Sequence, residues 1–199
     1  MKVRGLFGMK RSRRLAEEEE GEPKSIIGCK GANVYFHSHI SKQTILEFIE
    51  KLHEAVEYVS KCPAMDNERR VFVYIHSEGG DMFAGLSAMN HIRTCPCKVV
   101  TIVDGFCASA ATIMYLGSSE RWMMRHSQFL IHQLTTGFFG KYCDLKDEYA
   151  NTTNLMHTIE EIYSHATKIP SKKLQKLLKG ESYMTTDLCL KYEVCNKIV

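Results

Sequence analysis

The chain has 199 residues, of which 44% are hydrophobic and 25% charged, and its formal net charge is +3. This length and composition predict one globular domain with a sizeable core. Six basic residues lie within the first fourteen positions and the acidic run Glu17 to Glu20 follows, a pattern typical of a solvated, mobile tail. No basic face is visible in the rest of the chain, which argues against nucleic-acid binding.

The eight cysteines are more typical of a reducing compartment than of secretion. Residues 1–14 lack an apolar stretch followed by a small-residue cleavage site, so no signal peptide is predicted. Cys95-Pro96-Cys97 is too tight for a usual zinc knuckle, and we expect reduced cysteines that are mostly small core residues, with no metal. The most apolar stretch, Val99 to Gly117, is too short and too polar to span a membrane. We expect a cytoplasmic protein, with organellar or host-cell cytoplasm left open.

Regular secondary structure is expected only after an irregular N-terminal segment. Residues 1–30 are predicted to be a flexible segment ahead of a single domain at 31–199. Asn33–His37 alternates aromatic and β-branched residues, which predicts a strand. Ser41 is a predicted N-cap for a helix whose apolar residues recur at helical spacing as far as Val59.

Two units of strand, turn and helix follow. The continuous apolar runs Val71–Ile75 and Val99–Val103 predict strands buried on both faces, and Gly105 is expected to end the second. Helices are expected at Met82–Ile92 and Ala108–Leu116. This alternation predicts an α/β fold with largely parallel strands.

The second half of the chain predicts short strands and three helices. In order, these are strands at Trp122–Met124 and Phe129–Ile131, a loop marked by Gly137 and Gly140, a long helix at Asp144–Ala166, a short helix from Pro170 closed by Gly180, a last helix from Asp187, and the chain end at Ile198-Val199.

Three segments carry the residue types of acyl-transfer chemistry. Ser77-Glu78-Gly79-Gly80 follows a strand, and its glycines can expose backbone N–H groups to an oxyanion, although a plain tight turn has the same pattern. In Gly105-Phe106-Cys107-Ala108-Ser109-Ala110-Ala111 the serine meets the positive end of a helix, as a nucleophile or as an ordinary N-cap. His132 ends an apolar strand, where a neutral imidazole can exchange a proton or be merely structural.

In this order and at this spacing, the segments resemble the proteolytic subunit of the ATP-dependent Clp protease, a serine peptidase family. That family has a Ser-x-Gly-Gly turn, a Gly-x-x-Ala-Ser segment and an Ile-His-Gln segment, and here Ser109 follows Gly80 by 29 residues and precedes His132 by 23. The resemblance runs from about Asn33 to Val199. It implies Ser109 as nucleophile, His132 as general base, and the N–H groups of Gly80 and Ala110 as the oxyanion hole.

The family also has a third catalytic residue, a carboxylate that orients the histidine, and this chain departs from the family at that position. The family has Asp before a Phe/Tyr-Met/Leu-Ser/Thr-Ala segment, and the matching position here holds Glu181. Glutamate can orient a histidine in such triads, so the resemblance implies Glu181 as the third member. A surface glutamate after a helix end remains the alternative interpretation, and Asp187 is the nearest other carboxylate, although it suits a helix N-cap better.

Other departures concern the cleft and the N-terminus. Glu78 and Leu134 stand where the family usually has Pro, and the N-terminal segment does not match the family's axial loop. A viral or phage-encoded relative would fit these departures.

The resemblance implies a Clp/crotonase-type fold with repeated strand-strand-helix units and a projecting handle at about 135–166. The handle's apolar stripe needs a partner, which in the family is a second ring, so heptameric rings stacked as a tetradecamer are expected. The expected activity is a serine endopeptidase inside this chamber, fed with unfolded protein or peptide by an AAA+ unfoldase. Any ATP is used by that partner, since the chain has no Gly-x-x-x-x-Gly-Lys-Ser/Thr segment.

Two other classes of protein remain alternatives. A catalytically silent, ring-completing subunit is expected to have lost Ser109 or His132, and both are present. A crotonase-type acyl-CoA enzyme shares the fold and also uses paired backbone amides. Serine at 109 followed by His132 favours the peptidase.

Overall fold

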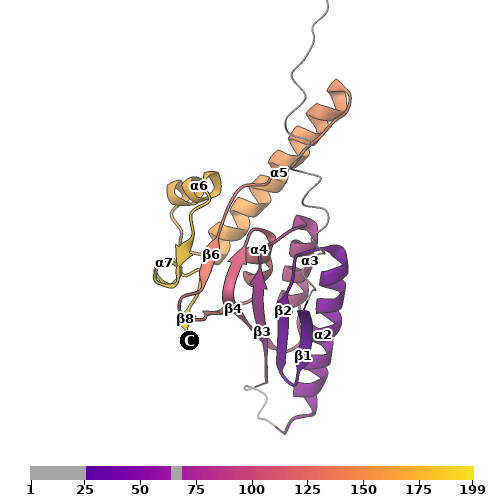
Figure 1. The fold of residues 1–199 in the computed structure, drawn as a ribbon, viewed down its shortest axis with the longest axis vertical. Helices are drawn as coiled ribbons and strands as arrows, with labels where there is room; N and C mark the ends of the chain where they lie inside the picture. The colour runs from indigo at the N-terminus through magenta and orange to yellow at the C-terminus, as the bar shows by residue number, and fades with distance from the viewer. Residues whose placement is uncertain (1–25, 64–68) are drawn as a thin grey trace, which may run out of the picture.

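The computed structural model describes residues 26–63 and 69–199 (Figure 1). The strands are β1 (Ile26–Lys30), β2 (Asn33–His37), β3 (Arg70–Ser77), β4 (Lys98–Ala108), β5 (Glu120–Met123), β6 (Gln128–Leu130), β7 (Met184–Thr185) and β8 (Lys197–Ile198). The helices are α2 (Lys42–Lys61), α3 (Met82–Arg93), α4 (Ala110–Tyr115), α5 (Tyr142–Ala166), α6 (Ser171–Lys179) and α7 (Thr186–Lys191).

The described strands form one mixed sheet in the order β1-β2-β3-β4-β5-β8. Strand β6 pairs with the far end of β4, and β7 pairs with β6. The pairings from β2 to β3, β3 to β4, β4 to β5, β4 to β6 and β5 to β8 are parallel, while β1–β2 and β6–β7 are antiparallel. The predicted α/β class with largely parallel pairing is confirmed.

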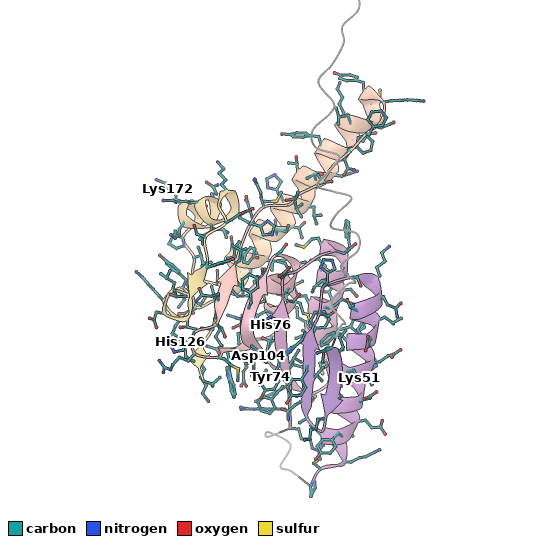
Figure 2. The ribbon with its side chains drawn as sticks, viewed as in Figure 1. Lys51, Tyr74, His76, Asp104, His126 and Lys172 are labelled. Atoms are coloured by element: carbon teal, nitrogen blue, oxygen red, sulfur yellow. The ribbon has the colours of Figure 1, made fainter. Side chains whose placement is uncertain are left out.

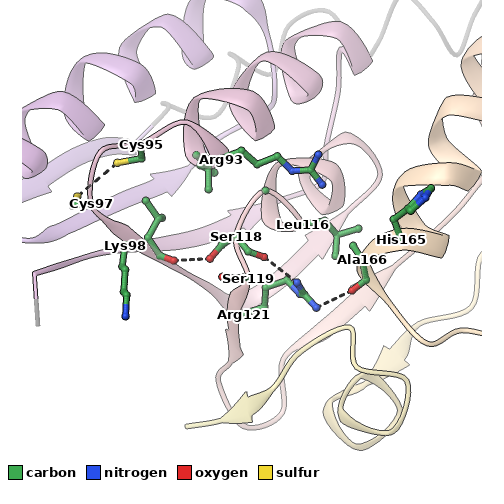
Figure 3. Close-up of a pocket in the computed structure, with 13 residues that line it drawn as sticks. Arg93, Cys95, Cys97, Lys98, Leu116, Ser118, Ser119, Arg121, His165 and Ala166 are labelled. Atoms are coloured by element: carbon green, nitrogen blue, oxygen red, sulfur yellow. Dashed lines mark hydrogen bonds between the residues drawn. The ribbon is translucent and has the colours of Figure 1, made fainter. Parts of the chain in front are cut away.

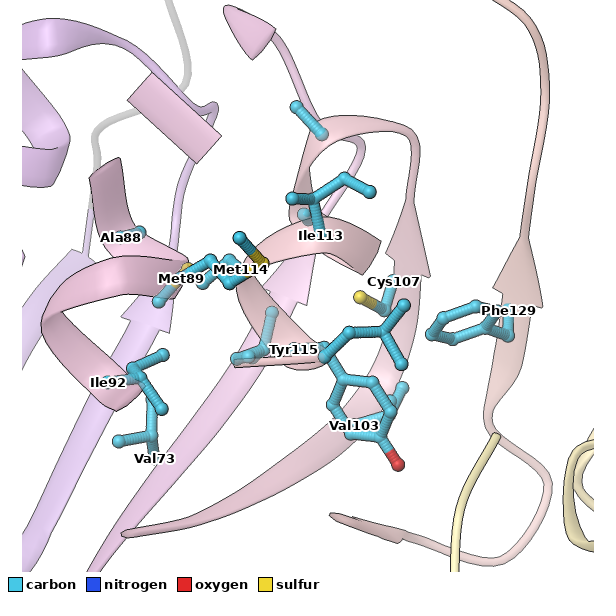
Figure 4. Close-up of a cluster of buried hydrophobic side chains, with 14 of the residues drawn as sticks. Val73, Ala88, Met89, Ile92, Val103, Cys107, Ile113, Met114, Tyr115 and Phe129 are labelled. Atoms are coloured by element: carbon cyan, nitrogen blue, oxygen red, sulfur yellow. The ribbon is translucent and has the colours of Figure 1, made fainter. Parts of the chain in front are cut away.

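The core lies between one face of the sheet and helices α2, α3 and α4. Along β3 the buried residues Val71, Val73 and Ile75 alternate with more exposed ones, as the two-residue period of a strand requires. Figure 4 shows how Met89 of α3 and Met114 of α4 pack together above this face. Because every residue of α4 is buried, this short helix is fixed firmly against the end of β4.

The opposite face of the sheet carries aromatic and polar side chains. Tyr74, His76 and Asp104 lie together there (Figure 2), and Nδ1 of His76 lies 2.7 Å from the carbonyl oxygen of Asp104. Nε2 of His37 lies 3.1 Å from the Asp104 carboxylate. These contacts tie β2, β3 and β4 together next to the irregularity in the β3–β4 register.

Helix α5 projects from the body of the molecule as the handle does in the expected fold (Figure 1). It begins at Tyr142, two residues before the predicted start, and ends at Ala166 as predicted. Its buried residues are Ile159, Ile162 and Tyr163, all in its last two turns. Leu155 and Met156, one turn earlier, are partly buried against the core as well, so the helix contacts the body through its C-terminal half.

Three expectations about local structure are wrong. Residues Ile26–Lys30, within the segment predicted to be irregular, form β1, because pairing with β2 supplies the hydrogen bonds that a short run cannot supply alone; residues 1–25 lie outside the described part. Gly105 does not end its strand: it has φ +93° within β4, next to an irregularity in the β3–β4 register. Asp187 is not an N-cap, since Thr185 caps α7.

The eight cysteines carry free thiols. Cys107, Cys189 and Cys195 are buried, as expected of core residues, whereas Cys143 is exposed and the others are half-buried.

Candidate active site

Ser109 occupies the sharp turn between β4 and α4. Its φ of 55° and ψ of −130° lie outside the ordinary regions for a residue with a side chain. Its hydroxyl makes no capping hydrogen bond to α4, so the interpretation as an ordinary N-cap serine does not hold. Strained backbone of this kind collects at functional sites, where the fold holds a side chain in one direction.

The turn after β3 lies directly against Ser109. Gly79 has φ +98°, and a Cβ built on it would lie 2.5 Å from Cβ of Ser109 and 3.0 Å from the backbone nitrogen of Ala110. Gly80 has φ +144°, and a Cβ there would lie 2.2 Å from the carbonyl oxygen of Ile40. Only glycine fits at these two positions, which explains the Gly-Gly pair physically.

The backbone N–H groups of Gly80 and Ala110 come from these two turns. The neighbouring groups of the first turn are occupied, because the Gly79 carbonyl accepts from Ile40 and the Asp81 N–H donates to the Ile40 carbonyl. For the N–H groups of Gly80 and Ala110, the described part of the chain offers no hydrogen-bond acceptor. Two such donors beside a nucleophile can stabilise an oxyanion.

His132 lies two residues beyond β6. Strand β6 pairs with the end of β4, with Ala108 opposite Leu130, so adjacent parallel strands lead to the serine and to the histidine. The N–H of Gln133 donates to the carbonyl of Leu178 at 2.7 Å, which fixes the chain just after the imidazole. His132 is half-buried and makes no hydrogen bond to Ser109 in this structure. Such bonds often tighten only when substrate binds.

A cavity of about 930 Å³ joins these groups. Ser109, His132, Gly80 and Ala110 all line it. Helix α5 supplies one wall with Leu155, Ile159 and Tyr163, and Leu134 and Met82 add further apolar surface. Three carboxylates, Glu78, Asp81 and Glu148, also reach the lining, which includes no Lys or Arg among the described residues. The cavity is large enough for several residues of an extended peptide.

The structure places Glu181 near this site but not in contact with the histidine. Phe129 of β6 pairs with Met184 of β7, so the strand that begins three residues after Glu181 lies beside the strand that leads to His132. The β6–β7 register is not kept as far as the histidine, because the next residue, Gln133, donates its N–H to the Leu178 carbonyl. The Glu181 side chain is exposed, forms no ion pair with His132 and does not line the cavity. Asp187, in the first turn of α7, is exposed as well.

The sequence analysis did not identify Thr112 and Tyr163, two residues whose hydroxyl groups help to hold the Ser109 backbone. The N–H of Ser109 donates to the Leu130 carbonyl at 3.1 Å. Its carbonyl accepts from the hydroxyl of Thr112 at 2.5 Å, and that hydroxyl also contacts the hydroxyl of Tyr163. The threonine in the first turn of a small-residue helix was a visible signal, whereas nothing in the pattern of α5 distinguished Tyr163 from an ordinary core residue.

A second cavity, of about 470 Å³, lies at the other end of α4 (Figure 3). The guanidinium of Arg121 donates to the carbonyls of Ser118 and Ala166 there, and also to those of Val194 and Glu193. The sulfur atoms of Cys95 and Cys97 lie 3.6 Å apart, and burial, with the nearby Cys95, raises the pKa of Cys97 to about 12. Arg121 is thus committed to holding the chain together, and the Cys97 thiol favours its neutral, less nucleophilic form.

Within residues 26–63 and 69–199, no three His, Cys, Asp or Glu side chains are grouped so that they could bind a metal ion. In the same ranges, no helix has the length and apolar character needed to cross a membrane.

Comparison with known proteins places the chain in a family of peptidases. The sequence model of the Clp protease family matches residues 33–199. The chain therefore belongs to the Clp protease family.

The curated relatives include proteolytic subunits from several bacteria. The ATP-dependent Clp protease proteolytic subunit 2 of Borreliella burgdorferi is 32% identical over 173 residues, which are 85% of this chain and 83% of that subunit. The subunit of Deinococcus radiodurans is 27% identical over 134 residues, 66% of each chain. Among solved structures, ClpP1 from Listeria monocytogenes and a point mutant of it align with TM-scores of 0.69 and 0.72 at 18% and 17% identity, each covering 84% of this chain and 91% of the other. These structures confirm the Clp/crotonase-type fold.

Proposed function

We propose that the chain is a serine endopeptidase that cleaves peptide bonds through an acyl-enzyme. The observation that carries this proposal is the strained, uncapped Ser109, which shares one cavity with His132 and with the N–H groups of Gly80 and Ala110. Family membership supports peptidase chemistry in general, and this arrangement of groups supports the serine type.

In the proposed reaction, Oγ of Ser109 attacks the carbonyl carbon of the scissile peptide while the imidazole of His132 takes the hydroxyl proton. The oxyanion that forms accepts hydrogen bonds from Gly80 and Ala110. Collapse of this intermediate breaks the C–N bond, and His132 returns the proton to the leaving amine. A water molecule then attacks the acyl-enzyme, with His132 as base, and releases Ser109. All of these steps use groups that the chain itself supplies.

Glu181 is the carboxylate that we assign to His132. The pairing of β7 with β6 supports this assignment, because it brings the segment that follows Glu181 alongside the strand that leads to His132. A rotation of its exposed side chain, or a small movement of residues 180–183, is needed to form the contact.

We further propose that the chain works in an assembly. The exposed apolar side chains Phe139, Leu145 and Tyr149 on and beside α5 leave the handle without a partner in the single chain. Rings of seven, stacked in pairs through the handles, would bury them and enclose the sites, and an AAA+ unfoldase would then supply unfolded substrate. The relatives' names support a Clp complex with an ATP-dependent component.

Labelling with a fluorophosphonate, followed by peptide mapping, tests the proposal. We expect a single modified residue, Ser109, and we expect Ser109→Ala to abolish both labelling and peptide cleavage. His132→Ala should cost nearly as much, with little further loss in the double variant, because the two groups act as a unit. Labelling that persists in Ser109→Ala contradicts the assignment, and turnover of acyl-CoA thioesters by the purified chain would favour the crotonase-type alternative.

A further inference from the structure

The backbone conformation of Ser109 must be held by its surroundings. With φ 55° and ψ −130°, a serine persists only where neighbouring groups oppose its relaxation. The Leu130 carbonyl holds the N–H side of the residue. On the carbonyl side, the Ser109 oxygen accepts from the backbone N–H of Thr112 at 2.9 Å and from its hydroxyl at 2.5 Å. Thr112 is therefore the residue that restrains this end of the nucleophile.

The hydrogen bonds through Thr112 have a definite direction. A threonine hydroxyl has one proton to donate, and the Ser109 carbonyl can only accept. The hydroxyl of Tyr163 must then donate to Oγ1 of Thr112. Both side chains are buried, at 0% and 2% exposure, so water does not compete for either bond. A donor to Oγ1 polarises the threonine hydroxyl and strengthens its bond to Ser109.

Tyr163 belongs to the handle helix rather than to the body that carries Ser109. It lies in the buried C-terminal end of α5, where the helix meets the body, and it also lines the cavity. Burial raises the pKa of Tyr163, so its hydroxyl remains protonated and able to donate at any physiological pH. The position of α5 is thus linked to the Ser109 backbone through two consecutive hydrogen bonds.

We propose that Tyr163 is a positioning residue, which acts through Thr112 to hold Ser109 in its reactive conformation. The rate of acylation then depends on how the C-terminal end of α5 packs against the body. This inference rests on the proposed function, since it treats Ser109 as the nucleophile. It predicts that loss of the Tyr163 hydroxyl slows acylation without weakening substrate binding. A merely structural hydroxyl would affect stability alone.

The test compares two hydroxyl-deleting variants with two matched controls in the full chain. Tyr163→Phe and Thr112→Val remove the two hydroxyls with little change of shape. Thr112→Ser keeps the hydroxyl and is the rescue variant. The controls Tyr115→Phe and Thr101→Val remove buried hydroxyls that donate to the carbonyls of Trp122 and Tyr115, and neither control residue lines the cavity that holds Ser109.

Four measurements are made on each variant: the thermal midpoint, the rate of fluorophosphonate acylation, kcat and KM for a peptide, and hydrogen exchange of a peptide spanning residues 107–114. We expect about tenfold slower acylation and lower kcat in Tyr163→Phe, because one hydrogen bond is lost, with KM unchanged. Thr112→Val should be slower still, Thr112→Ser close to the original chain, and the double variant no worse than Thr112→Val. Exchange in residues 107–114 should rise in both hydroxyl-deleting variants.

The controls should lose thermal stability yet acylate at the original rate. The proposal is overturned if Tyr163→Phe is acylated as fast as Tyr115→Phe. It is also overturned if Tyr163→Phe changes only KM and leaves kcat unchanged. Failure of the proposed function looks different: the original chain would then not be labelled at all. In that case hydrogen exchange still decides the role of Tyr163, because unchanged exchange in Tyr163→Phe refutes it without any activity.

Discussion

The backbone N–H of Ser109 donates to the carbonyl of Leu130 at 3.1 Å, two residues before His132. This bond continues the parallel pairing of β4 with β6 past the last pair, Ala108 with Leu130. The candidate nucleophile and base are therefore placed by two neighbouring strands rather than by flexible loops. Such sites hold their geometry well, because the strands are fixed by the core.

The strain at Ser109 predicts an unusual response to glycine. At φ 55° glycine is not penalised, so Ser109→Gly should be more stable than Ser109→Ala by about 1 kcal/mol, or about 2–4 °C in the thermal midpoint. The matched control is Ala150→Gly at an exposed helical position of α5, where glycine should destabilise by about 1 kcal/mol. Equal midpoints for the two Ser109 variants would show that the turn is not strained.

The glycine turn beside Ser109 should tolerate no side chain. In Gly79→Ala the new Cβ meets Cβ of Ser109 and the Ala108 carbonyl, and the backbone stays at φ +98°, which costs about 1–3 kcal/mol before the clash is counted. We expect a lower thermal midpoint and no fluorophosphonate labelling. Gly137→Ala, which has no atom within 4 Å of the new Cβ, should behave as the original chain. A labelled, stable Gly79→Ala chain would contradict the close packing of Gly79 against Ser109.

Alkaline pH should destabilise the chain through its buried thiols. Burial raises the pKa of Cys195 to about 11 from an ordinary 9.0, and raises the pKa of Cys107 and Cys189 as well. Above pH 9 the unfolded chain therefore loses protons that the folded chain keeps, so stability falls as pH rises. Each such thiol removes about 1.4 kcal/mol per pH unit, and Cys195 does so up to about pH 11.

Urea midpoints between about pH 8 and pH 11 measure this slope. Cys195→Ala should make the slope shallower by about one proton, whatever it does to stability at the lowest pH. Cys143→Ala, at an exposed position of α5, is the control and should leave the slope unchanged. A slope that is the same in all three chains would mean that Cys195 ionises alike in the folded and unfolded states.

The sequence predicted most of the fold because its signals are local. Ser41 caps α2 with the expected side-chain hydrogen bond, since its hydroxyl accepts from the Thr44 N–H and the Thr44 hydroxyl accepts from the Ser41 N–H. Asn33–His37 forms β2 with the predicted bounds. Gly105 was misjudged because glycine permits both a strand end and an irregular strand, and only the pairing with β3 decides between them.

The candidate site was predictable only in part, for a related reason. Motif spacing brought Ser109, His132, Gly80 and Ala110 together, and all four line one cavity. The contact between Thr112 and Tyr163 joins residues 51 positions apart, and helical periodicity marks both merely as inward-facing. Long-range hydrogen bonds of this kind depend on how α5 sits against the body, which no local pattern encodes.

The exposed apolar side chains of α5 predict a contact between two rings, and one substitution in that contact should separate the rings. Leu145 and Tyr149 are 52% and 76% exposed on α5 in the single chain. If these side chains meet a second ring, Leu145→Asp should bury a charge in that contact and halve the mass measured by light scattering. Leu46→Asp, at a similarly exposed site on α2, is the control. An original chain that is only monomer or dimer at micromolar concentration refutes the ring.

Glu181 gives the sharpest test of the third catalytic position, because β7, which follows it, pairs with the strand that leads to His132, while the exposed Glu181 side chain forms no ion pair with the imidazole. If Glu181 stabilises the imidazolium that forms during acylation, Glu181→Gln should lower kcat by a few orders of magnitude, as expected when a triad acid is neutralised without a change of shape. Glu181→Asp is informative about the backbone: reduced activity means that the chain has adapted to the longer side chain, and equal or higher activity means that it has not.

Asp187→Asn, in the first turn of α7, is the matched control and should keep full activity. Full activity in Glu181→Gln beside an inactive Asp187→Asn would transfer the role to Asp187. Full activity in both would leave a Ser109–His132 dyad whose imidazole is oriented by backbone groups or water.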